Sequence, residues 1–192
     1  MTWDKKMVAV FPQKHLTDLA EWHRLGEAGI FPPESRMELI NGEILHMAPI
    51  GFNHAGHVTR LIHFFAPLLN NQALINAQNP LQLGDLSEPE PDFALLRPEP
   101  NFYSTRHPKA DDVLLLIEVS DSTLRFDRTQ KLRLYATFNI PEYWIVNLID
   151  DCLEVYRQPN DGDYLDKSTL GKTDSLNLVA LPEIKIALAD IL

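Results

Sequence analysis

The segment from Val113 to Val119, with the sequence VLLLIEV, constrains the fold of this chain more than any other feature. A continuous apolar run of this length is typical of a β-strand that is covered on both faces, at the centre of a sheet. Its one polar residue is Glu118, and an unpaired ionised carboxylate in a dry interior would cost several kcal/mol. Glu118 therefore needs a compensating cation or hydrogen-bond donors. The simplest partner is an arginine or lysine on a covering helix, which would make Glu118 a purely structural residue.

A tight hairpin is predicted where the sequence reads MELINGEILHM, over residues 37–47. Asn41-Gly42 at its centre suits the positive φ angles of a type I′ turn. A two-residue hairpin of this register places Glu38 opposite Leu45. Glu38 is therefore expected to share a face with apolar neighbours.

Three segments have the periodicity and the end signals of helices. The first begins after Thr17, its predicted N-cap, and runs to about residue 25. The second begins near Asn53 and should be ended or distorted by Pro67. The third begins at about Asp127, which can cap it, and ends before Pro141.

Other apolar segments are typical of strands around the central one. They span residues 74–78, 81–83, 92–96, 143–146 and 152–157, with one or two more beyond residue 162. Helices beside a mixed, centrally buried sheet give an α/β or α+β layer fold. Because neither a low-complexity linker nor an internal repeat is present, we expect a single domain over residues 1–192.

Composition and missing motifs exclude several classes of protein. The one cysteine, Cys152, cannot form an internal disulfide, and no CxxC or HExxH zinc motif is present. The nucleotide-binding motifs GxxxxGK[ST] and GxGxxG are absent as well, and so is GxSxG, the nucleophile elbow of many hydrolases.

No window approaches the ~20 apolar residues of a membrane helix, and residues 1–11 lack a signal-peptide pattern, so we expect a cytoplasmic protein. The formal net charge of −10 argues against tight non-specific DNA binding by a monomer, unless a basic surface is local.

Asp92 and Glu118 lie on predicted consecutive strands and could form one metal site. Asp92 follows Pro91 at the start of an apolar strand, where an aspartate alone would be an ordinary turn residue. Two carboxylates on neighbouring strands can converge on one divalent ion, and Mg²⁺ characteristically takes one or two protein carboxylates plus waters. Lys131, on the helix that follows the Glu118 strand, could point back at both carboxylates. The alternative is a solvated lysine in a basic region.

These residues lie in motifs that resemble the PD-(D/E)xK nuclease superfamily and, within it, the Uma-type restriction-endonuclease-like family of small bacterial proteins. The superfamily likeness rests on Pro91-Asp92 and on Glu118-Val119-Ser120. The family likeness runs from about Thr17 to Leu192. It rests on MELINGEIL, the helix start at His54, EPEPDFALL, LLLIEVSDST, DRTQKLRLYA, and IPEYWIVNL followed by LEVYRQ, taken together.

The resemblance implies a restriction-endonuclease-like core and metal-dependent hydrolysis of phosphodiester bonds. Asp92 and Glu118 match the metal ligands, and Glu38 matches an auxiliary acidic position that would bind a second ion or a metal-bound water. The superfamily pattern would place a lysine at position 120, where this chain has Ser120. Lys131 matches the lysine that this family carries on the following helix. It would orient the attacking water and offset the negative charge of the transition state.

His54 also matches a family position, at the start of the second helix, where it could carry a proton or contact a phosphate. His57 lies three residues further along the same face. Gln78 and Gln82 fit the family pattern, but they are equally typical of amides at a strand edge. Tyr135, in the third helix, is best interpreted as a core residue.

Two functions follow from these patterns. The first is a Mg²⁺- or Mn²⁺-dependent nuclease acting on DNA, with a homodimer as the expected assembly and the apolar residues 184–192 as a candidate dimer surface. In this nuclease Lys131→Ala should remove activity with little change in thermal stability. The second is a catalytically inactive nuclease-fold module for binding or oligomerisation, which the acidic charge favours. A basic groove beside Asp92 would favour the nuclease, and a uniformly acidic face would favour the module.

Overall fold

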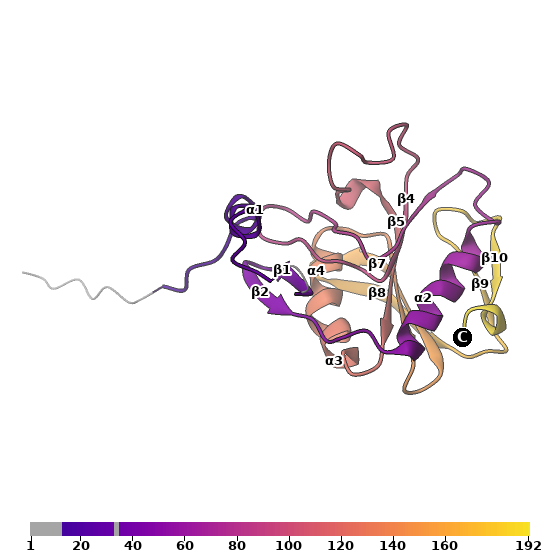
Figure 1. Ribbon diagram of the computed structural model, residues 1–192. Coiled ribbons are helices and arrows are strands. Elements are labelled where there is room, and N and C mark those ends of the chain that lie inside the picture. The colour runs from indigo at the N-terminus through magenta and orange to yellow at the C-terminus, as the bar shows by residue number, and fades with distance from the viewer. Residues whose placement is uncertain (1–12, 33–34) are drawn as a thin grey trace, which may run out of the picture.

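The computed structural model describes residues 13–32 and 35–192 and has a six-stranded sheet at its centre (Figure 1). Residues 1–11, where the sequence shows no signal-peptide pattern, lie outside this range. The sheet has the order β3-β4-β5-β6-β7-β8. Its strands are β3 (Leu74–Asn76), β4 (Phe93–Leu96), β5 (Val113–Ser120), β6 (Glu142–Asn147), β7 (Cys152–Asn160) and β8 (Asp163–Leu170). β5 and β6 run parallel and the other neighbouring pairs are antiparallel, so the sheet is mixed, as predicted.

β5 is the strand that the VLLLIEV run predicts. All eight of its residues, from Val113 to Ser120, are buried. It lies between β4 and β6, and its side chains enter two apolar cores, one on each face of the sheet. Because both faces are covered, the strand shows no alternation of polar and apolar residues.

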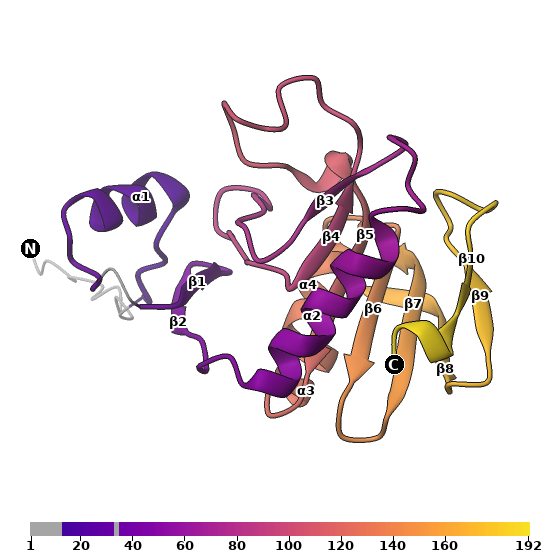
Figure 2. The same ribbon diagram turned by 45° about the vertical axis from the view of Figure 1, so that its right-hand side comes forward.

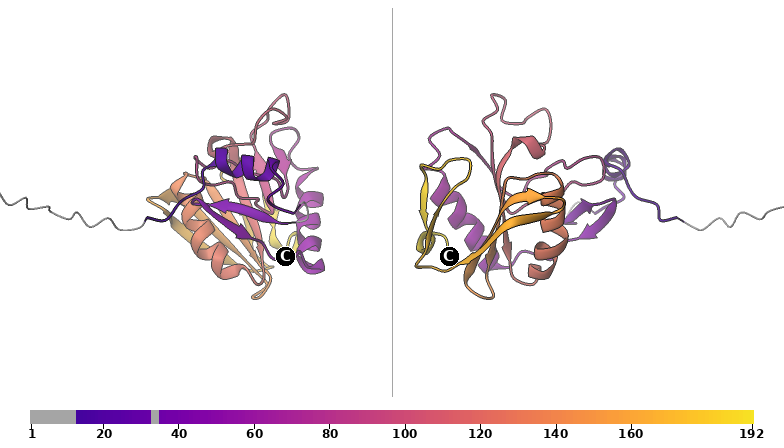
Figure 3. Two further views of the ribbon diagram at one scale, coloured as in Figure 1. Left: turned by 60° about the vertical axis from the view of Figure 1, so that its left-hand side comes forward. Right: turned by 180° about the vertical axis from the view of Figure 1, so that it is seen from behind.

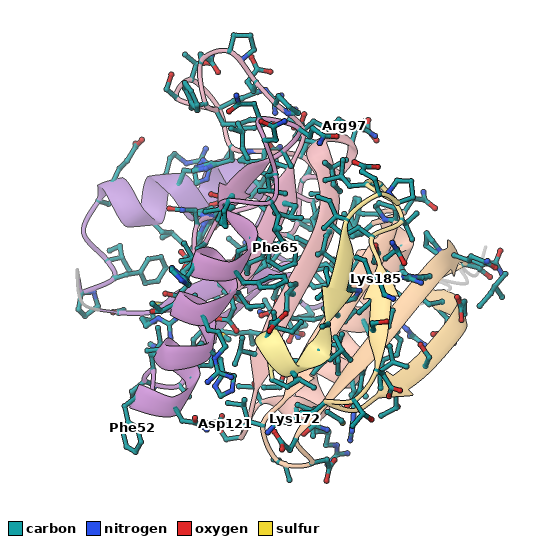
Figure 4. All side chains as sticks on the ribbon, turned by 90° about the vertical axis from the view of Figure 1, so that its right-hand side faces the viewer. Phe52, Phe65, Arg97, Asp121, Lys172 and Lys185 are labelled. Atoms are coloured by element: carbon teal, nitrogen blue, oxygen red, sulfur yellow. The ribbon has the colours of Figure 1, made fainter. Side chains whose placement is uncertain are left out.

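α2 (Phe52–Phe65) covers one face of the sheet, together with the two-stranded sheet of β9 (Ser175–Asn177) and β10 (Lys185–Ala187), as Figures 2 and 3 show. Phe65 points from α2 toward the central sheet (Figure 4), and its ring centroid lies 5.2 Å from that of Phe93. This face holds the larger of the two cores.

The opposite face is covered by a helical segment in three parts: α3 (Leu124–Phe126), the π-helical η2 (Asp127–Lys131) and α4 (Leu132–Thr137). Two short 3-10 turns, η1 (Ala110–Asp112) and η3 (Leu188–Asp190), complete the helical elements. Within residues 13–32 and 35–192, no helix has the length and apolar character needed to cross a membrane.

The N-terminal part consists of α1 (Leu19–Glu27) and the hairpin of β1 (Met37–Ile40) and β2 (Glu43–His46), which lie at one end of the molecule (Figure 2). The hairpin has the predicted register, with Glu38 opposite Leu45. Asn41 and Gly42 have φ angles of 51° and 77°, as the predicted turn requires. The sequence prediction of this hairpin is therefore confirmed.

The first two helices begin at other residues than predicted. α1 is capped by Asp18, whose carboxylate accepts a hydrogen bond from the backbone N–H of Glu21, and not by Thr17. α2 begins at Phe52, next to the predicted start near Asn53, and its N-cap is Gly51. Several polar or small residues stand at each helix start, and any of them can leave the helical conformation, so the pattern alone does not choose between them.

The third helical segment begins at Leu124, so Asp127 lies inside it and is not its cap. The Asp127 carboxylate accepts hydrogen bonds from Ser120 Oγ at 2.7 Å and Thr123 Oγ1 at 2.6 Å. The prediction that Asp127 caps this helix is therefore wrong. Its hydrogen-bond donors come from the end of β5 and from the turn before the helical segment.

Residues 81–83 do not form a strand of the sheet. Gln82 makes an isolated bridge with Lys109, and the predicted strand here is therefore wrong. Pro80 precedes the segment and Gly84, with a φ angle of 66°, follows it. These two residues leave too short an extended stretch to form a ladder.

Residues 184–192 pack into the core of the chain itself. Ile186, Leu188 and Ile191 are fully buried on the α2 face. The segment is apolar because it completes this core, so the expectation that it serves as a dimer surface is wrong.

Candidate active site

The five side chains that the sequence marks as a site line one pocket, with a volume of about 160 Å³. Glu38 comes from β1, His54 from α2, Asp92 from the turn before β4, Glu118 from β5 and Lys131 from η2. The rest of the lining includes residues 47–51, which follow the hairpin, and residues 121–123, which follow β5. The tertiary structure thus brings together side chains as far apart in sequence as Glu38 and Lys131.

Asp92 and Glu118 lie side by side at one end of neighbouring strands. β4 and β5 pair antiparallel with Phe93 opposite Ile117, which brings the preceding Asp92 beside Glu118. The backbone N–H of Asp92 donates to Glu118 Oε2 at 3.4 Å. The backbone N–H of Val119 donates to Asp92 Oδ2 at 2.9 Å. Both carboxylates are buried and both face the pocket.

Lys131 is 2% exposed, and its ammonium group lies between two carboxylates. Its Nζ donates to Glu118 Oε1 at 3.0 Å and to Glu38 Oε1 at 3.2 Å. Burial would lower the pKa of Lys131, but the charges of Glu118 and Glu38 outweigh burial and hold this pKa above its ordinary value. Lys131 is therefore a cation in a buried position, and the interpretation of it as a solvated lysine is wrong.

The π-helical turn of η2 places Lys131 and Asp127 on the inner side of the helical segment, where both are buried. A π-helical turn contains more residues than an α-helical turn, so it changes which side chains face the sheet, and such turns are frequent at functional sites. Ser120, at the position where the superfamily has lysine, donates to Asp127. Ser120 thus contacts the same π-helical turn that carries Lys131.

The pair of Glu118 with Lys131 is also the salt bridge that the purely structural interpretation of Glu118 predicts. The pair does not balance the charge of its surroundings, however, because Lys131 is shared with Glu38. Burial raises the pKa of Glu118 well above its ordinary value, against the effect of Lys131, and Asp92 and Asp127 raise it further. The buried cluster therefore carries more carboxylates than cations, which favours binding of a further positive charge.

His54 contacts the metal-ligand candidate Asp92 from the start of α2. Its Nε2 lies 2.9 Å from Asp92 Oδ2, and its Nδ1 is buried with no hydrogen-bond partner among the described residues. The hydrogen bond to Asp92 raises the pKa of His54, against the opposing effect of burial. Burial favours protonated Asp92, but the hydrogen bond and charge of His54 outweigh it, so the pKa of Asp92 lies below its ordinary value.

The donor set of the pocket fits a divalent ion held by two carboxylates. Asp92 and Glu118 are neighbours, and Glu38 Oε2 is buried without a hydrogen-bond partner in the described part of the chain, which leaves it free to accept a hydrogen bond from a water in the pocket. The ligand atoms of these three residues do not all lie within 4.8 Å of one another. Direct binding of one ion by all three is therefore not supported. Mg²⁺ retains several waters and needs only one or two protein carboxylates.

The sequence analysis did not identify Glu90 as a residue of the site, and it interpreted Tyr135 only as a core residue. Glu90 is half-buried in the pocket wall, its backbone N–H donates to Glu38 Oε1 at 3.1 Å, and burial raises its pKa with a further contribution from Glu38. The alternation of acids in EPEPD could have identified it, because residues two apart on an extended segment share a face. Tyr135 is buried in the core, as expected, and its hydroxyl also donates to Glu118 Oε1 at 2.6 Å.

Of the three other polar residues named from the sequence, one reaches the site and two lie outside it. Gln78 reaches the site, because its Nε2 donates to Asp92 Oδ1 at 3.3 Å. His57 is exposed and its Nδ1 donates to the backbone carbonyl of Asn53, outside the pocket. Gln82 donates to a backbone carbonyl two residues away and does not line the pocket.

The pocket wall is acidic. Among the described residues it contains six carboxylates and two permanent cations, and the imidazole of His54. The carboxylates belong to Glu38, Glu90, Asp92, Glu118, Asp121 and Asp127, and the cations to Arg36 and Lys131. Such a wall is not the basic groove that would favour a nuclease. It attracts a divalent cation and repels anions, so an anionic ligand could approach only after a cation had offset this charge.

Comparison with known proteins places this chain in a family. A sequence profile of the Uma2 family, described as "Putative restriction endonuclease", matches residues 19–189. A crystal structure described as that of a "putative nuclease belonging to DUF820 from Anabaena variabilis" is similar in fold, with a TM-score of 0.69. The similarity covers 87% of this chain and 96% of that chain, at 16% sequence identity. No curated protein matches the chain significantly. Since the family profile spans most of the sequence and the fold agrees, the chain belongs to the Uma2 family of restriction-endonuclease-like proteins.

Proposed function

We propose that this chain is a Mg²⁺-dependent endonuclease that hydrolyses phosphodiester bonds of DNA. The observation that carries the proposal is the convergence of Asp92, Glu118 and Lys131 in one pocket, with Lys131 fully enclosed among carboxylates. Such an arrangement contributes little to stability in comparison with an apolar core, so its presence in a pocket favours a chemical role. Membership of a restriction-endonuclease-like family supports the same proposal.

The residues of the pocket would have separate roles, as metal ligands and as residues that position those ligands. Asp92 and Glu118 would bind the ion, and a bound Mg²⁺ would polarise the phosphate and lower the pKa of a coordinated water. His54 holds Asp92 in place through the contact to Oδ2, and Tyr135 holds Glu118 through Oε1. The protein thereby fixes both carboxylates before the substrate arrives, which avoids reorganisation during the reaction.

Among the described residues, Glu118 and Glu38 are the hydrogen-bond partners of Lys131 Nζ, which leaves one N–H for the reaction. Two of the three N–H groups of an ammonium are engaged by Glu118 and Glu38, and the side chain lines the pocket. The third N–H could donate to the attacking water or to a phosphate oxygen, where the charge of Lys131 would offset the charge that develops in the transition state. Glu38 Oε2 would accept a hydrogen bond from a water in the pocket.

The test is cleavage of supercoiled plasmid by purified protein with Mg²⁺ or Mn²⁺, compared with the variants Asp92→Asn, Glu118→Gln and Ser120→Ala. The first two should lose cleavage by a factor of at least about 10² if the carboxylates hold the ion. Ser120→Ala is the matched control, because it removes a buried hydroxyl of the same strand end whose hydrogen bond goes to Asp127. Cleavage that survives in Asp92→Asn and Glu118→Gln would contradict the proposal. Absence of cleavage in the wild type, with metal binding intact, would support the inactive module instead.

We extend the proposal to a homodimer in the cytoplasm, because cutting both strands of DNA requires two active sites or two successive events. The C-terminal segment is occupied by the core, so a dimer would use another surface, such as β8, which is an edge strand among the described residues. Light scattering during size-exclusion chromatography, with and without a DNA duplex, tests this part. A monomer under both conditions would contradict it.

A further inference from the structure

A second cluster of metal-ligating side chains lies outside the pocket, where α1 meets two loops. His23 is on α1, Glu88 lies in the segment between β3 and β4, and His107 lies in the segment before η1. Their ligand atoms all lie within 4.8 Å of one another, and no other group of three has this property among the described residues. We propose that these three residues bind a transition-metal ion, with Zn²⁺ as the best match, at a structural site separate from the pocket.

The contacts show how closely the three side chains converge. His23 Nε2 lies 3.1 Å from Glu88 Oε1 and 3.0 Å from Glu88 Oε2. The ring centroids of His23 and His107 are 6.3 Å apart. Two ligands of a tetrahedral ion with bonds of ~2.1 Å are about 3.4 Å apart, so the observed atoms need only small rotations to reach such a geometry. Both histidines are exposed and can make these rotations.

Glu88 is the most informative of the three. It is 6% exposed, yet its one ion-pair partner among the described residues is His23, which is charged only when it is protonated. A buried carboxylate needs a cation or several donors, and a neutral His23 supplies at most one hydrogen. Trp22 Nε1 donates to Glu88 Oε1 at 3.0 Å and fixes the orientation of the carboxylate. An outer donor of this kind is a usual feature of metal-ligating carboxylates.

The donor set determines the class of ion. Two imidazole nitrogens with one carboxylate are ligands for Zn²⁺ and similar transition ions, whereas Mg²⁺ prefers oxygen ligands alone. The pocket offers two adjacent carboxylates, Asp92 and Glu118, and therefore the opposite preference. The two sites can be distinguished by the metal that each binds.

The position of the cluster suggests what an ion there would do. α1 has nine residues and buries only Leu19, so apolar packing holds it weakly. Glu88 is fixed to β1 through its backbone N–H, which donates to the carbonyl of Leu39 at 2.7 Å. An ion shared by His23, Glu88 and His107 would attach α1 to the segment that also carries Glu90 and Asp92, at the edge of the pocket.

The experiment uses tag-free protein that carries Asp92→Asn and Glu118→Gln, so that the pocket no longer competes for the metal. Isothermal titration with Zn²⁺ should give one ion per chain, and Mg²⁺ should give none. Zn²⁺ at a hundredfold excess over its Kd should raise the Tm by about 5–10 °C. X-ray absorption of the Zn²⁺ complex should show two imidazoles and light-atom ligands at ~2.0–2.1 Å.

His23→Gln and His107→Gln, added singly, should each weaken Zn²⁺ binding at least tenfold, and His63→Gln should leave it unchanged. His63 is the matched control because it is an exposed helical histidine outside the cluster. Equal affinity in all three variants, or no Zn²⁺ binding before they are added, would overturn the proposal. If a variant loses its circular dichroism signal, the absorption spectrum of the parent protein decides, since fewer than two imidazole ligands there would overturn the proposal as well. None of these outcomes depends on nuclease activity.

Discussion

Replacing Lys131 by methionine removes a buried charge and keeps most of the side-chain volume. In the wild type, Nζ contacts Glu118 Oε1 at 3.0 Å and Glu38 Oε1 at 3.2 Å. After the substitution two buried carboxylates face each other without their cation. Removing one partner of a buried ion pair typically costs about 3–5 kcal/mol. For a chain of this size that corresponds to a fall in Tm of about 6–20 °C.

This expectation reverses the one drawn from the sequence, that a substitution of Lys131 leaves stability nearly unchanged. The reason is burial, because a solvated lysine would lose little and a lysine that is 2% exposed between two acids loses its whole electrostatic environment. Loss of activity in Lys131→Met is therefore not sufficient to establish a catalytic role. The variant must first be shown to be folded at the temperature of the assay.

The dependence on pH separates this explanation from a packing defect. Burial raises the pKa of Glu118 in the folded state above its ordinary value. A group with a raised folded pKa stabilises the fold below its unfolded pKa and loses this contribution as the pH rises through the folded pKa. Without Lys131 the folded pKa of Glu118 rises further, so the stability loss should be smaller at pH 5 than at pH 7. A packing defect would be independent of pH over this range.

Thermal and denaturant unfolding at pH 5 and pH 7 measure the effect. Adding Glu118→Gln to Lys131→Met should restore part of the lost stability, because one of the two unpaired charges is removed. Lys172→Met is the matched control, since the pair of Lys172 with Asp151 is exposed and worth less than about 1 kcal/mol. If Lys131→Met melted like the wild type at pH 7, the electrostatic account of the cluster would be refuted.

Three further predictions concern the pocket and its rim. Glu118→Gln should melt at or above the wild type at pH 7 without metal, because Lys131 keeps Glu38 as its ion-pair partner and burial already favours the neutral form of Glu118. It should also abolish the rise in Tm with Mn²⁺, and a persisting rise, by calorimetry, would contradict the metal site. His54→Gln should lower the free energy of unfolding most at pH values between the lowered pKa of Asp92 and the raised pKa of His54. The difference from the wild type should become smaller as the pH rises through the pKa of His54, and a difference that grows toward pH 9 would contradict the ion pair. Phe52 is 96% exposed at the start of α2 and points away from the protein (Figure 4), so Phe52→Ala should weaken DNA binding severalfold in fluorescence anisotropy with the Tm unchanged, and unchanged affinity would exclude it from the DNA surface.

The sequence was most informative where a local pattern determines the local structure. The apolar run of β5 required a strand with both faces covered, and the Asn41-Gly42 turn required a tight hairpin in one register. Pro67 ended the apolar face of α2 close to Phe65. In each case the relevant interactions are between residues near in sequence, or between one strand and whatever apolar surface covers it.

Helix starts and the short segment 81–83 were predicted less well, because several local solutions have similar energies there. Asp127 could cap a helix or accept hydrogen bonds from Ser120 and Thr123, and only the packing of the segment against β5 selects the second. The same packing includes the π-helical turn that directs Lys131 inward. No periodicity in the sequence signals such a turn.

The sequence by itself determined which residues could carry chemistry, because Glu118 is a carboxylate in an apolar strand and Asp92 begins the predicted neighbouring strand. Only the tertiary structure decided how they are used. Burial of Lys131, the free Oε2 of Glu38 and the contact of His54 with Asp92 depend on distances between segments that are up to 93 residues apart. Those distances follow from the packing of whole elements on the two faces of the sheet, and a pattern of neighbouring residues contains no information about them.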